Sequence, residues 1–172
     1  YGGVAGETMA AWVVNEGGLH APDRATIDAA IARCERPFLA RARKPGALEE
    51  VRERLYELMW DRVGIIRDRA GLEAAIGGLG ELRGLLGESG VADGDRAFNL
   101  TWHDWMNLSS LVDVSEVIAR AALAREDSRG AHFRSDFPEP GPLEKTAFTS
   151  VRQDGAGLAI AMKPVDFSIV RP

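Results

Sequence analysis

The densest group of side chains that could do chemistry lies between Arg125 and Pro138. It holds three arginines, one histidine and three carboxylates, namely Arg125, Glu126, Asp127, Arg129, His132, Arg134 and Asp136. Guanidinium and carboxylate groups at such short spacing form charge-assisted hydrogen bonds. The charge pattern alone favours a solvated helix end, because exposed ion pairs are common and contribute little. The alternative is a set of buried ion pairs at an interface between domains.

The other candidates for chemistry indicate neither catalysis nor metal binding. The histidines His20, His103 and His132 are too far apart in the sequence to form a ligand pair at helical spacing. His103 and Asp104 could join a nearby serine in a triad, but these residues are expected on one helix, where successive positions point about 100° apart. We therefore expect no catalytic, cofactor-binding or metal-binding residues in this chain.

The composition indicates an ordinary globular domain. The chain has 172 residues, of which 45% are hydrophobic and 27% charged. Its net charge of -5 and the lack of a basic run argue against a nucleic-acid partner, and its short apolar stretches argue against a transmembrane segment. Cys34 is the only cysteine, which excludes an internal disulfide, and its place on an apolar stripe predicts a buried thiol.

The elements that must position these side chains are mainly helices. An apolar stretch predicts a partial helix over residues 4–14, and Pro22 and Asp23 mark the start of a second helix. A third helix begins at Pro45. The apolar stripe of the second helix consists of Ile27, Ile31, Cys34 and Phe38, and that of the third consists of Leu48, Val51, Leu55, Leu58, Met59 and Ile66.

Two further helices follow. One carries Leu72, Ile76, Leu79, Leu82 and Leu86, and its glycines Gly77, Gly78, Gly80 and Gly84 predict close contact with another helix. The longest begins near Asn99 or Thr101, with Asp104 placed for a capping box, and ends at Gly130. Its predicted buried face consists of Trp105, Leu108, Leu111, Ile118 and Ala122. Arg125 and Arg129 are expected to complement its negative pole.

Helical order is predicted to end at Phe137, because three prolines follow within five residues. Alternating residues from Leu158 to Lys163 and the Asp154-Gly155 pair then predict a β-hairpin with residues 146–152. The predicted fold is mainly α, an antiparallel three- to four-helix bundle with a small C-terminal β-hairpin. We expect residues 1–18 to form a leading helix, 19–137 the helical bundle domain, and 138–172 the connector, hairpin and tail.

The polar segment closely resembles the Arg-x-Glu-Ser-Arg-Gly-Ala-His-x-Arg-x-Asp-Phe/Tyr-Pro signature of the succinate dehydrogenase and fumarate reductase flavoprotein family. The matching residues are Arg125, Asp127, Ser128, Arg129, Gly130, Ala131, His132, Arg134, Asp136, Phe137 and Pro138, with Asp127 standing where the family usually has glutamate. Segments 58–67 (Leu-Met-Trp-Asp-Arg-Val-Gly-Ile-Ile-Arg), 105–108 (Trp-Met-Asn-Leu), 1–6 and 163–165 look like the same family.

The resemblance implies a parent enzyme that uses FAD to move two electrons across a carbon–carbon bond of a dicarboxylate. This chain would be its helical C-terminal domain, excised within a helix that leads out of the flavin-binding domain, and would be inactive alone. Arg125, Asp127, Arg129, His132, Arg134 and Asp136 would then form an interdomain contact. The flavin-binding domain is the expected partner, together with an iron–sulfur subunit or a second copy of the chain.

The expected location is the cytoplasm, or the membrane periphery through partner subunits. Two alternatives stay open on the sequence. L-aspartate oxidases carry a similar domain and signature, and a free-standing helical interaction module would have no enzymatic parent.

Overall fold

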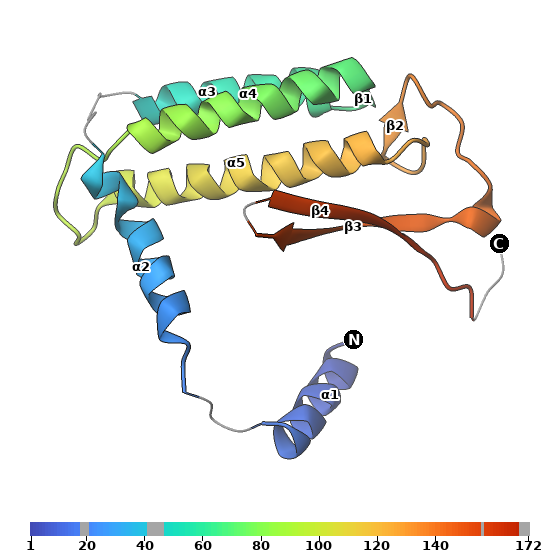
Figure 1. The fold of residues 1–172 in the computed structure, drawn as a ribbon, viewed down its shortest axis with the longest axis horizontal. Helices are drawn as coiled ribbons and strands as arrows, with labels where there is room; N and C mark the ends of the chain where they lie inside the picture. Colours follow the sequence, from blue (N-terminus) through green and yellow to red (C-terminus); the bar gives the residue numbers. More distant parts are fainter. Residues whose placement is uncertain (18–20, 41–46, 156, 169–172) are drawn as a thin grey trace. The chain divides into compact units, whose positions relative to one another are not determined.

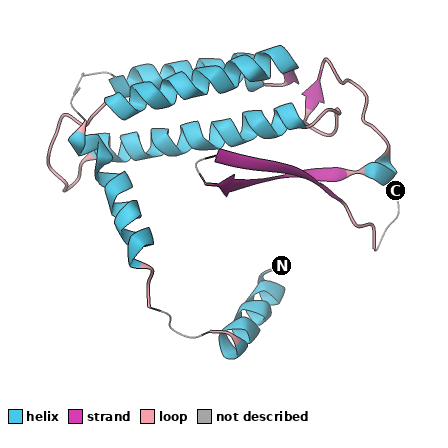
Figure 2. Cartoon of the chain, in the orientation of Figure 1, coloured by secondary structure: helices cyan, strands magenta, loops and turns pink. Residues whose placement is uncertain are grey.

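The computed structural model describes residues 1–17, 21–40, 47–155 and 157–168. Its elements in chain order are α1 (Gly2–Asn15), α2 (Arg24–Leu39), α3 (Ala47–Val63), β1 (Ile66–Arg67), α4 (Arg69–Glu88), α5 (Leu100–Ala124), β2 (Phe133–Arg134), the 3-10 helix η1 (Leu143–Lys145), β3 (Ala147–Asp154) and β4 (Gly157–Pro164) (Figure 1). Helices make up most of the chain (Figure 2). The chain divides into two compact units, Tyr1–Glu35 and Arg36–Pro172.

The first unit contains α1 and most of α2. None of the residues of α1 is buried, and Met9, Trp12 and Val13 are exposed. The predicted burial of the α2 stripe is only partly correct, because Ile31 is exposed and Cys34 is half-buried. The apolar stripe of a helix becomes buried only where another element packs against it. Within α2, Pro37 is the only buried residue, and α1 has none. The predicted domain boundaries at residues 18 and 137 stay predictions.

The second unit is built on three helices, α3, α4 and α5, which run antiparallel to their neighbours in sequence (Figure 1). Leucine and valine side chains at helical spacing fill the space between them; the fully buried ones are Val51, Leu55, Leu72, Leu79, Leu82, Leu108 and Val112. The buried Trp105 ring donates its Nε1 hydrogen to the carbonyls of Leu86 and Ser89, each at 3.0 Å. The predicted fold class, a mainly helical bundle with a C-terminal hairpin, is confirmed.

Two details of α3 and α4 differ from the prediction. Helix α3 ends at Val63, so Ile66 lies in β1 and is exposed. Of the four glycines expected at a helix contact, only Gly78 makes one: a Cβ there would lie 3.0 Å from Leu58 Cδ2, whereas Gly77, Gly80 and Gly84 have open space. The predicted start of α3 at Pro45 lies outside the described residues.

Helix α5 begins where predicted, but its capping and its end differ from the prediction. Its N-cap is Asn99, which accepts a hydrogen bond from the Trp102 amide at 2.9 Å, and Asp104 pairs with Arg52 at 2.6 Å instead of closing a capping box. It ends at Ala124, and Gly130 lies in a later turn with a φ of 59°. Leu111 and Ile118 are exposed, because the bundle is packed around the stripe of Trp105, Leu108, Val112, Ser115, Ala119 and Ala122.

The C-terminal hairpin forms as predicted. Strands β3 and β4 are antiparallel, with Ala147 opposite Pro164 and Asp154 opposite Gly157, and Gly155 has a φ of 57° in the turn. A left-handed backbone of this kind carries little steric cost for glycine. The hairpin lies along α5 (Figure 1). No helix among the described residues has the length and apolarity needed to cross a bilayer.

Candidate functional site

Three helix ends meet where α3 leads into β1, α4 begins and α5 leads toward β2 (Figure 1). Because α3 and α5 end here, they present negative poles, whereas α4 begins here and presents a positive pole. All six side chains predicted to form an interdomain contact lie at or near this end. We call them the polar cluster: Arg125, Asp127, Arg129, His132, Arg134 and Asp136.

Arg134 is the buried centre of the polar cluster, with a relative exposure of 0%. Its Nη1 donates to the carbonyls of Ala122, Leu123 and Arg125 at 3.0, 3.1 and 3.1 Å. These carbonyls belong to the last turn and C-cap of α5, which otherwise lack partners within the helix. The side chain that complements the negative pole of α5 is therefore Arg134, whereas the sequence had indicated Arg125 and Arg129.

Asp136 joins that pole to the start of α4. Its Oδ1 and Oδ2 accept from Arg134 Nε and Nη2, each at 2.7 Å, and Oδ2 also accepts from the Arg69 amide at 3.0 Å. The Arg134 guanidinium, above all, holds the pKa of the Asp136 carboxyl well below its ordinary value. One arginine–carboxylate pair thus couples the end of α5 to the beginning of α4.

Arg67 performs the equivalent role for α3. Its Nε donates to the carbonyls of Val63 and Gly64 at 3.0 and 2.8 Å, and its Nη1 lies 2.9 Å from His132 Nδ1. A guanidinium only donates, so Nδ1 accepts and Nε2 carries the proton, 3.4 Å from the Arg125 carbonyl. Burial, followed by the charges of neighbouring arginines, lowers the pKa of His132. The neutral imidazole therefore fits this position.

A short parallel ladder holds these groups in register. Strands β1 and β2 pair Ile66 with Phe133 and Arg67 with Arg134. The buried Ser128 fixes the turn, since its Oγ accepts from the Arg134 amide at 2.8 Å and donates to the Phe137 carbonyl at 2.7 Å. Sequence reasoning did not assign Arg67 or Ser128 to the site, although both lie within the segments that resemble the family.

The outer part of the polar cluster faces the connector before β3. Arg125 Nη1 donates to the Ala147 carbonyl at 2.8 Å, and Arg129 Nη1 donates to Thr146 Oγ1 at 2.6 Å. Asp127 lies between the two arginines, with ion-pair distances of 2.7 Å to Arg125 Nε and 3.5 Å to Arg129 Nε. Asp127 Oδ1 and Arg129 Nε are buried yet make no hydrogen bond of good geometry within the described chain.

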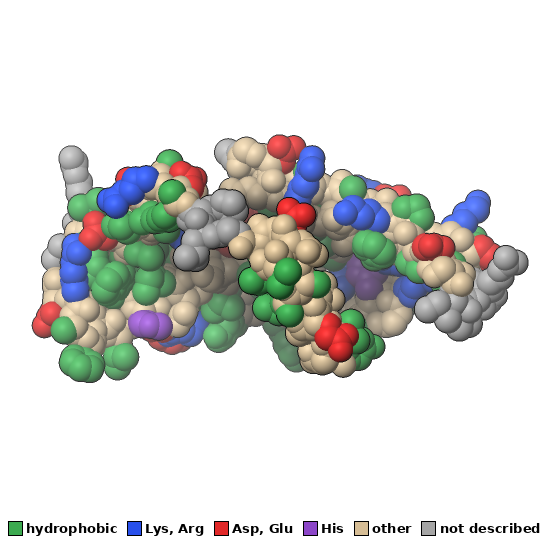
Figure 3. Space-filling view, turned by 90° about the horizontal axis from the view of Figure 1, so that it is seen from below, with side chains coloured by type: hydrophobic (Ala, Val, Ile, Leu, Met, Phe, Trp, Pro, Cys, Tyr) green, Lys and Arg blue, Asp and Glu red, His purple; other side chains and the backbone are tan. Residues whose placement is uncertain are grey.

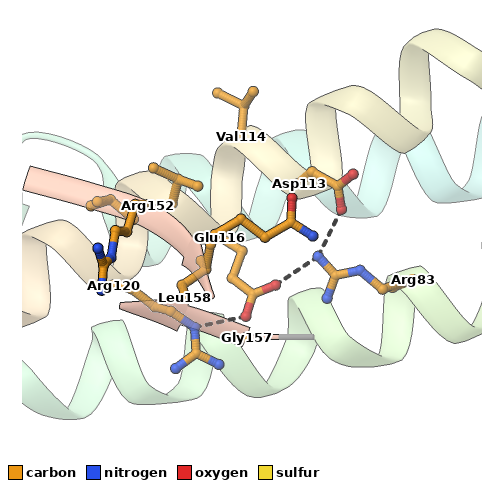
Figure 4. A pocket seen from close by; sticks show the side chains of 11 residues that line it. Arg83, Asp113, Val114, Glu116, Arg120, Arg152, Gly157 and Leu158 are labelled. Carbon is orange, nitrogen blue, oxygen red and sulfur yellow. Dashed lines mark hydrogen bonds and ion pairs between the residues drawn. The ribbon is translucent and has the colours of Figure 1, made fainter. Parts of the chain in front are cut away.

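A second polar site lies between α4, α5 and the hairpin. It is an open cavity of about 590 Å³, and Figure 4 shows its ion pairs: Arg83 contacts Asp113 at 3.0 Å and Glu116 at 2.6 Å, and Arg120 contacts Glu116 at 2.7 Å. Burial opposes ionisation of Glu116, but the two guanidinium groups outweigh it and lower the pKa of its carboxyl. These charges neutralise one another and tie α4 to α5.

The described residues contain no cluster of three histidine, cysteine or acidic side chains arranged for a metal ion. His103 lies on α5, and His20 lies outside the described residues. On the face seen in Figure 3, acidic and basic side chains are interspersed over the surface.

Known proteins are similar to this chain in the region that holds the polar cluster. The family described as "Fumarate reductase flavoprotein C-term" matches residues 52–172, which include the whole polar cluster. The succinate dehydrogenase flavoprotein subunit of Coxiella burnetii is 32% identical over 143 residues, covering 81% of this chain and 23% of that protein. The L-aspartate oxidase of Rhodospirillum rubrum is 35% identical over 97 residues, covering 56% of this chain and 29% of that protein.

The fold is similar as well. Mycobacterium smegmatis Sdh1, solved in complex with UQ1, superposes with a TM-score of 0.77 at 26% identity, over 91% of this chain and 26% of that one. The chain thus spans less than a third of the length of each of these relatives.

Proposed function

This chain belongs to the fumarate reductase flavoprotein C-terminal domain family, and on that premise we propose that it docks onto the flavin-binding part of a longer FAD-dependent oxidoreductase. The relatives' greater length supports this proposal, since each extends well beyond the matched region. In this role the domain holds its partner domain in place and takes no direct part in the chemistry.

We expect the flavin to be held by the part of the parent outside this chain. A dinucleotide is commonly held by a glycine-rich turn between a strand and a helix. The described strands form a two-residue ladder and a hairpin, and neither precedes such a turn. FAD, when bound to the parent, would exchange two electrons with a carbon–carbon bond of a dicarboxylate. No step of that reaction is assigned to residues described here.

The observation that carries the docking role is the outer part of the polar cluster. Arg125, Asp127 and Arg129 keep 16%, 24% and 22% of their side-chain surface exposed, whereas Arg134 keeps none. Asp127 Oδ1 and Arg129 Nε take part in the ion pairs of 2.7 and 3.5 Å given above, but neither atom makes a hydrogen bond of good geometry among the described residues. These partly exposed ion pairs have hydrogen-bonding capacity left over, and a polar group from a docked domain would use it.

The test is Arg129→Ala in the full-length parent, with Arg54→Ala as its control. Arg54 is a more exposed arginine whose ion pairs to Glu50 and Glu81 measure 3.8 and 3.6 Å. We expect Arg129→Ala to lower both the bound flavin per polypeptide and the melting temperature, and Arg54→Ala to change neither. Unchanged flavin content and melting temperature in Arg129→Ala would refute the docking role.

The parent's substrate class requires a separate assay. Relatives named for succinate dehydrogenation and L-aspartate oxidation both match this chain, so the two candidate substrate types are each a four-carbon dicarboxylate. Turnover of succinate, fumarate and L-aspartate by the full-length parent separates them. Sequencing the gene upstream of the Tyr1 codon tests whether a flavin-binding domain precedes this chain, as opposed to a free-standing module.

The parent's partners and location follow as part of the same proposal. We expect an iron–sulfur subunit or a second copy of the chain to assemble with it, and the assembly to lie in the cytoplasm or at the membrane periphery. Co-purification of the parent from its own cells, followed by mass spectrometry and membrane fractionation, tests both expectations. A parent recovered alone would contradict the subunit assembly, and the fraction in which it is recovered decides between the cytoplasm and the membrane periphery.

A further inference from the structure

In the β1–β2 ladder the charged side chains face inward and the apolar side chains face outward, the reverse of the usual arrangement at a protein surface. Paired residues of two neighbouring strands share one face, and successive residues alternate between faces. Arg67 and Arg134 therefore share the face that points to the helix ends, where Arg134 is fully buried. Ile66 and Phe133 share the other face, where they are 67% and 39% exposed. The charged residues lie inside and the apolar residues outside.

Other exposed apolar residues adjoin this ladder along the chain. Trp60, in the last turn of α3, is 79% exposed, and Ile65, which directly precedes β1, is 78% exposed. We call Trp60, Ile65, Ile66 and Phe133 the apolar end patch, because all four are exposed and lie at the end of the bundle where α3 leads into the ladder. The exposed Asp61 and Arg62 lie between Trp60 and Ile65 in the sequence. Exposed apolar side chains that adjoin charged ones are typical of a protein interface.

Resting on the docking role proposed above, we infer that the apolar end patch is the surface that the flavin-binding part of the parent covers. The inward face of the ladder is already occupied by the three helix ends, so the outward apolar face is the one available to a docked partner. The relatives contain such a part, because the matched region is only 26% of the Sdh1 chain. The patch also adjoins the polar cluster directly, through the Phe133–Arg134 peptide.

Trp60 is expected to anchor this contact. Tryptophan buries a large area on docking and is enriched among the residues that dominate interfaces. Its place in the last turn of a packed helix fixes its backbone before docking, so only the side chain has to be ordered.

Hydroxyl-radical footprinting of the full-length parent tests the inference. Oxidation of Trp60 and Phe133 is measured by mass spectrometry in the folded protein and in the urea-denatured protein. We expect Trp60 to be oxidised at least tenfold more slowly in the folded parent. Oxidation at nearly the denatured rate would overturn the inference. Protection that disappears on dilution to monomers would assign the patch to a second copy, and would also overturn it.

A matched pair of variants locates the contact. Ile65→Asp places a charge in the patch, and Leu100→Asp places one at the start of α5, at the other end of the bundle, where the leucine is 82% exposed. We expect Ile65→Asp to raise Trp60 oxidation in the folded parent at least fivefold and Leu100→Asp to leave it unchanged. Equal oxidation in the two variants would overturn the inference.

These outcomes are separable from those of the docking proposal. If Arg129→Ala releases flavin while Trp60 is oxidised at the denatured rate, the domain docks through the polar cluster and the patch inference alone fails. If Trp60 is protected while Arg129→Ala keeps its flavin and its melting temperature, the patch is covered and the proposed role of the polar cluster fails.

Discussion

Replacing Arg134 by methionine should destabilise the bundle more than any other single change in the polar cluster. Methionine keeps a long apolar stem in the same buried space but removes the guanidinium. The change deletes three hydrogen bonds to the last carbonyls of α5 and both hydrogen bonds to Asp136. It also removes the cation that lies 5.0 Å from the centre of the Phe137 ring.

The size of the effect follows from burial. Hydrogen bonds that involve a charged group contribute about 1.5–3 kcal/mol each, but they do not add when one side chain makes them all. Removing one partner of a buried ion pair typically costs about 3–5 kcal/mol. We expect the free energy of unfolding to fall within that range for Arg134→Met. This is a large part of the roughly 5–15 kcal/mol that stabilises an ordinary domain.

Urea unfolding of the chain, followed by far-ultraviolet circular dichroism at pH 7, measures this free energy. Arg54→Met is the control, because Arg54 is exposed and its ion pairs should contribute about 1 kcal/mol or less. Hydrogen exchange of the Arg69 amide adds a local readout, since its acceptor is the carboxylate that Arg134 positions. This amide should exchange faster in Arg134→Met and at the wild-type rate in Arg54→Met.

Two results would refute the reasoning. A loss below about 1 kcal/mol would mean that the buried hydrogen bonds of Arg134 are replaced by water or by relaxed backbone. A loss equal to that of Arg54→Met would mean that burial at this position has no energetic consequence. Arg134→Lys extends the test, because an ammonium cannot bind a carboxylate through two parallel N–H groups and should restore only part of the stability.

Three further predictions concern other residues. The free energy of unfolding should fall as pH drops below about 6.5, because the pKa of His132 is lowered in the folded chain and the unfolded chain therefore binds a proton more readily. Above that pH, the stabilisation from neutral His132 is complete. Urea titrations at pH 7.5 and 5.5 should show a smaller fall in His132→Gln than in His103→Gln. Gly80→Ala should stabilise the chain by about 1 kcal/mol through helix propensity, and Gly78→Ala should do so less, because its Cβ would lie 3.0 Å from a leucine of α3; equal melting temperatures would contradict this. Ser128→Ala should cost about 1–3 kcal/mol in urea unfolding, because the buried hydroxyl bonds two backbone groups, and a neutral change would show that water replaces it.

Local patterns in the sequence were sufficient for the elements that depend on near neighbours. The spacing of Leu72, Leu79, Leu82 and Leu86 predicted the buried side of α4, and Asp154-Gly155 predicted the hairpin turn. These features repeat at 3.6 residues or depend on a single left-handed residue, so they can be read without knowing what lies across the fold.

Predictions that depended on a distant partner were less accurate. Ile66 continued the apolar stripe of α3, but it pairs with Phe133 in a ladder that no local pattern indicates. Asp104 had the spacing of a capping residue, but Arg52 from another helix binds it. Leu111 and Ile118 lie on the other side of α5 from the one that α3 and α4 cover.

The polar cluster shows the same division. The sequence alone determined that arginine, histidine and carboxylate side chains are concentrated between residues 125 and 136, and that this segment resembles a flavoprotein family. Only the tertiary structure decided which arginine is buried, because burial depends on where the ends of α3, α4 and α5 meet. Two negative poles and one positive pole converge there. Arg134 neutralises the pole of α5, Arg67 that of α3 and Asp136 that of α4. The sequence does not show which of its charged residues take these places, because the three helix ends come together only in the folded chain.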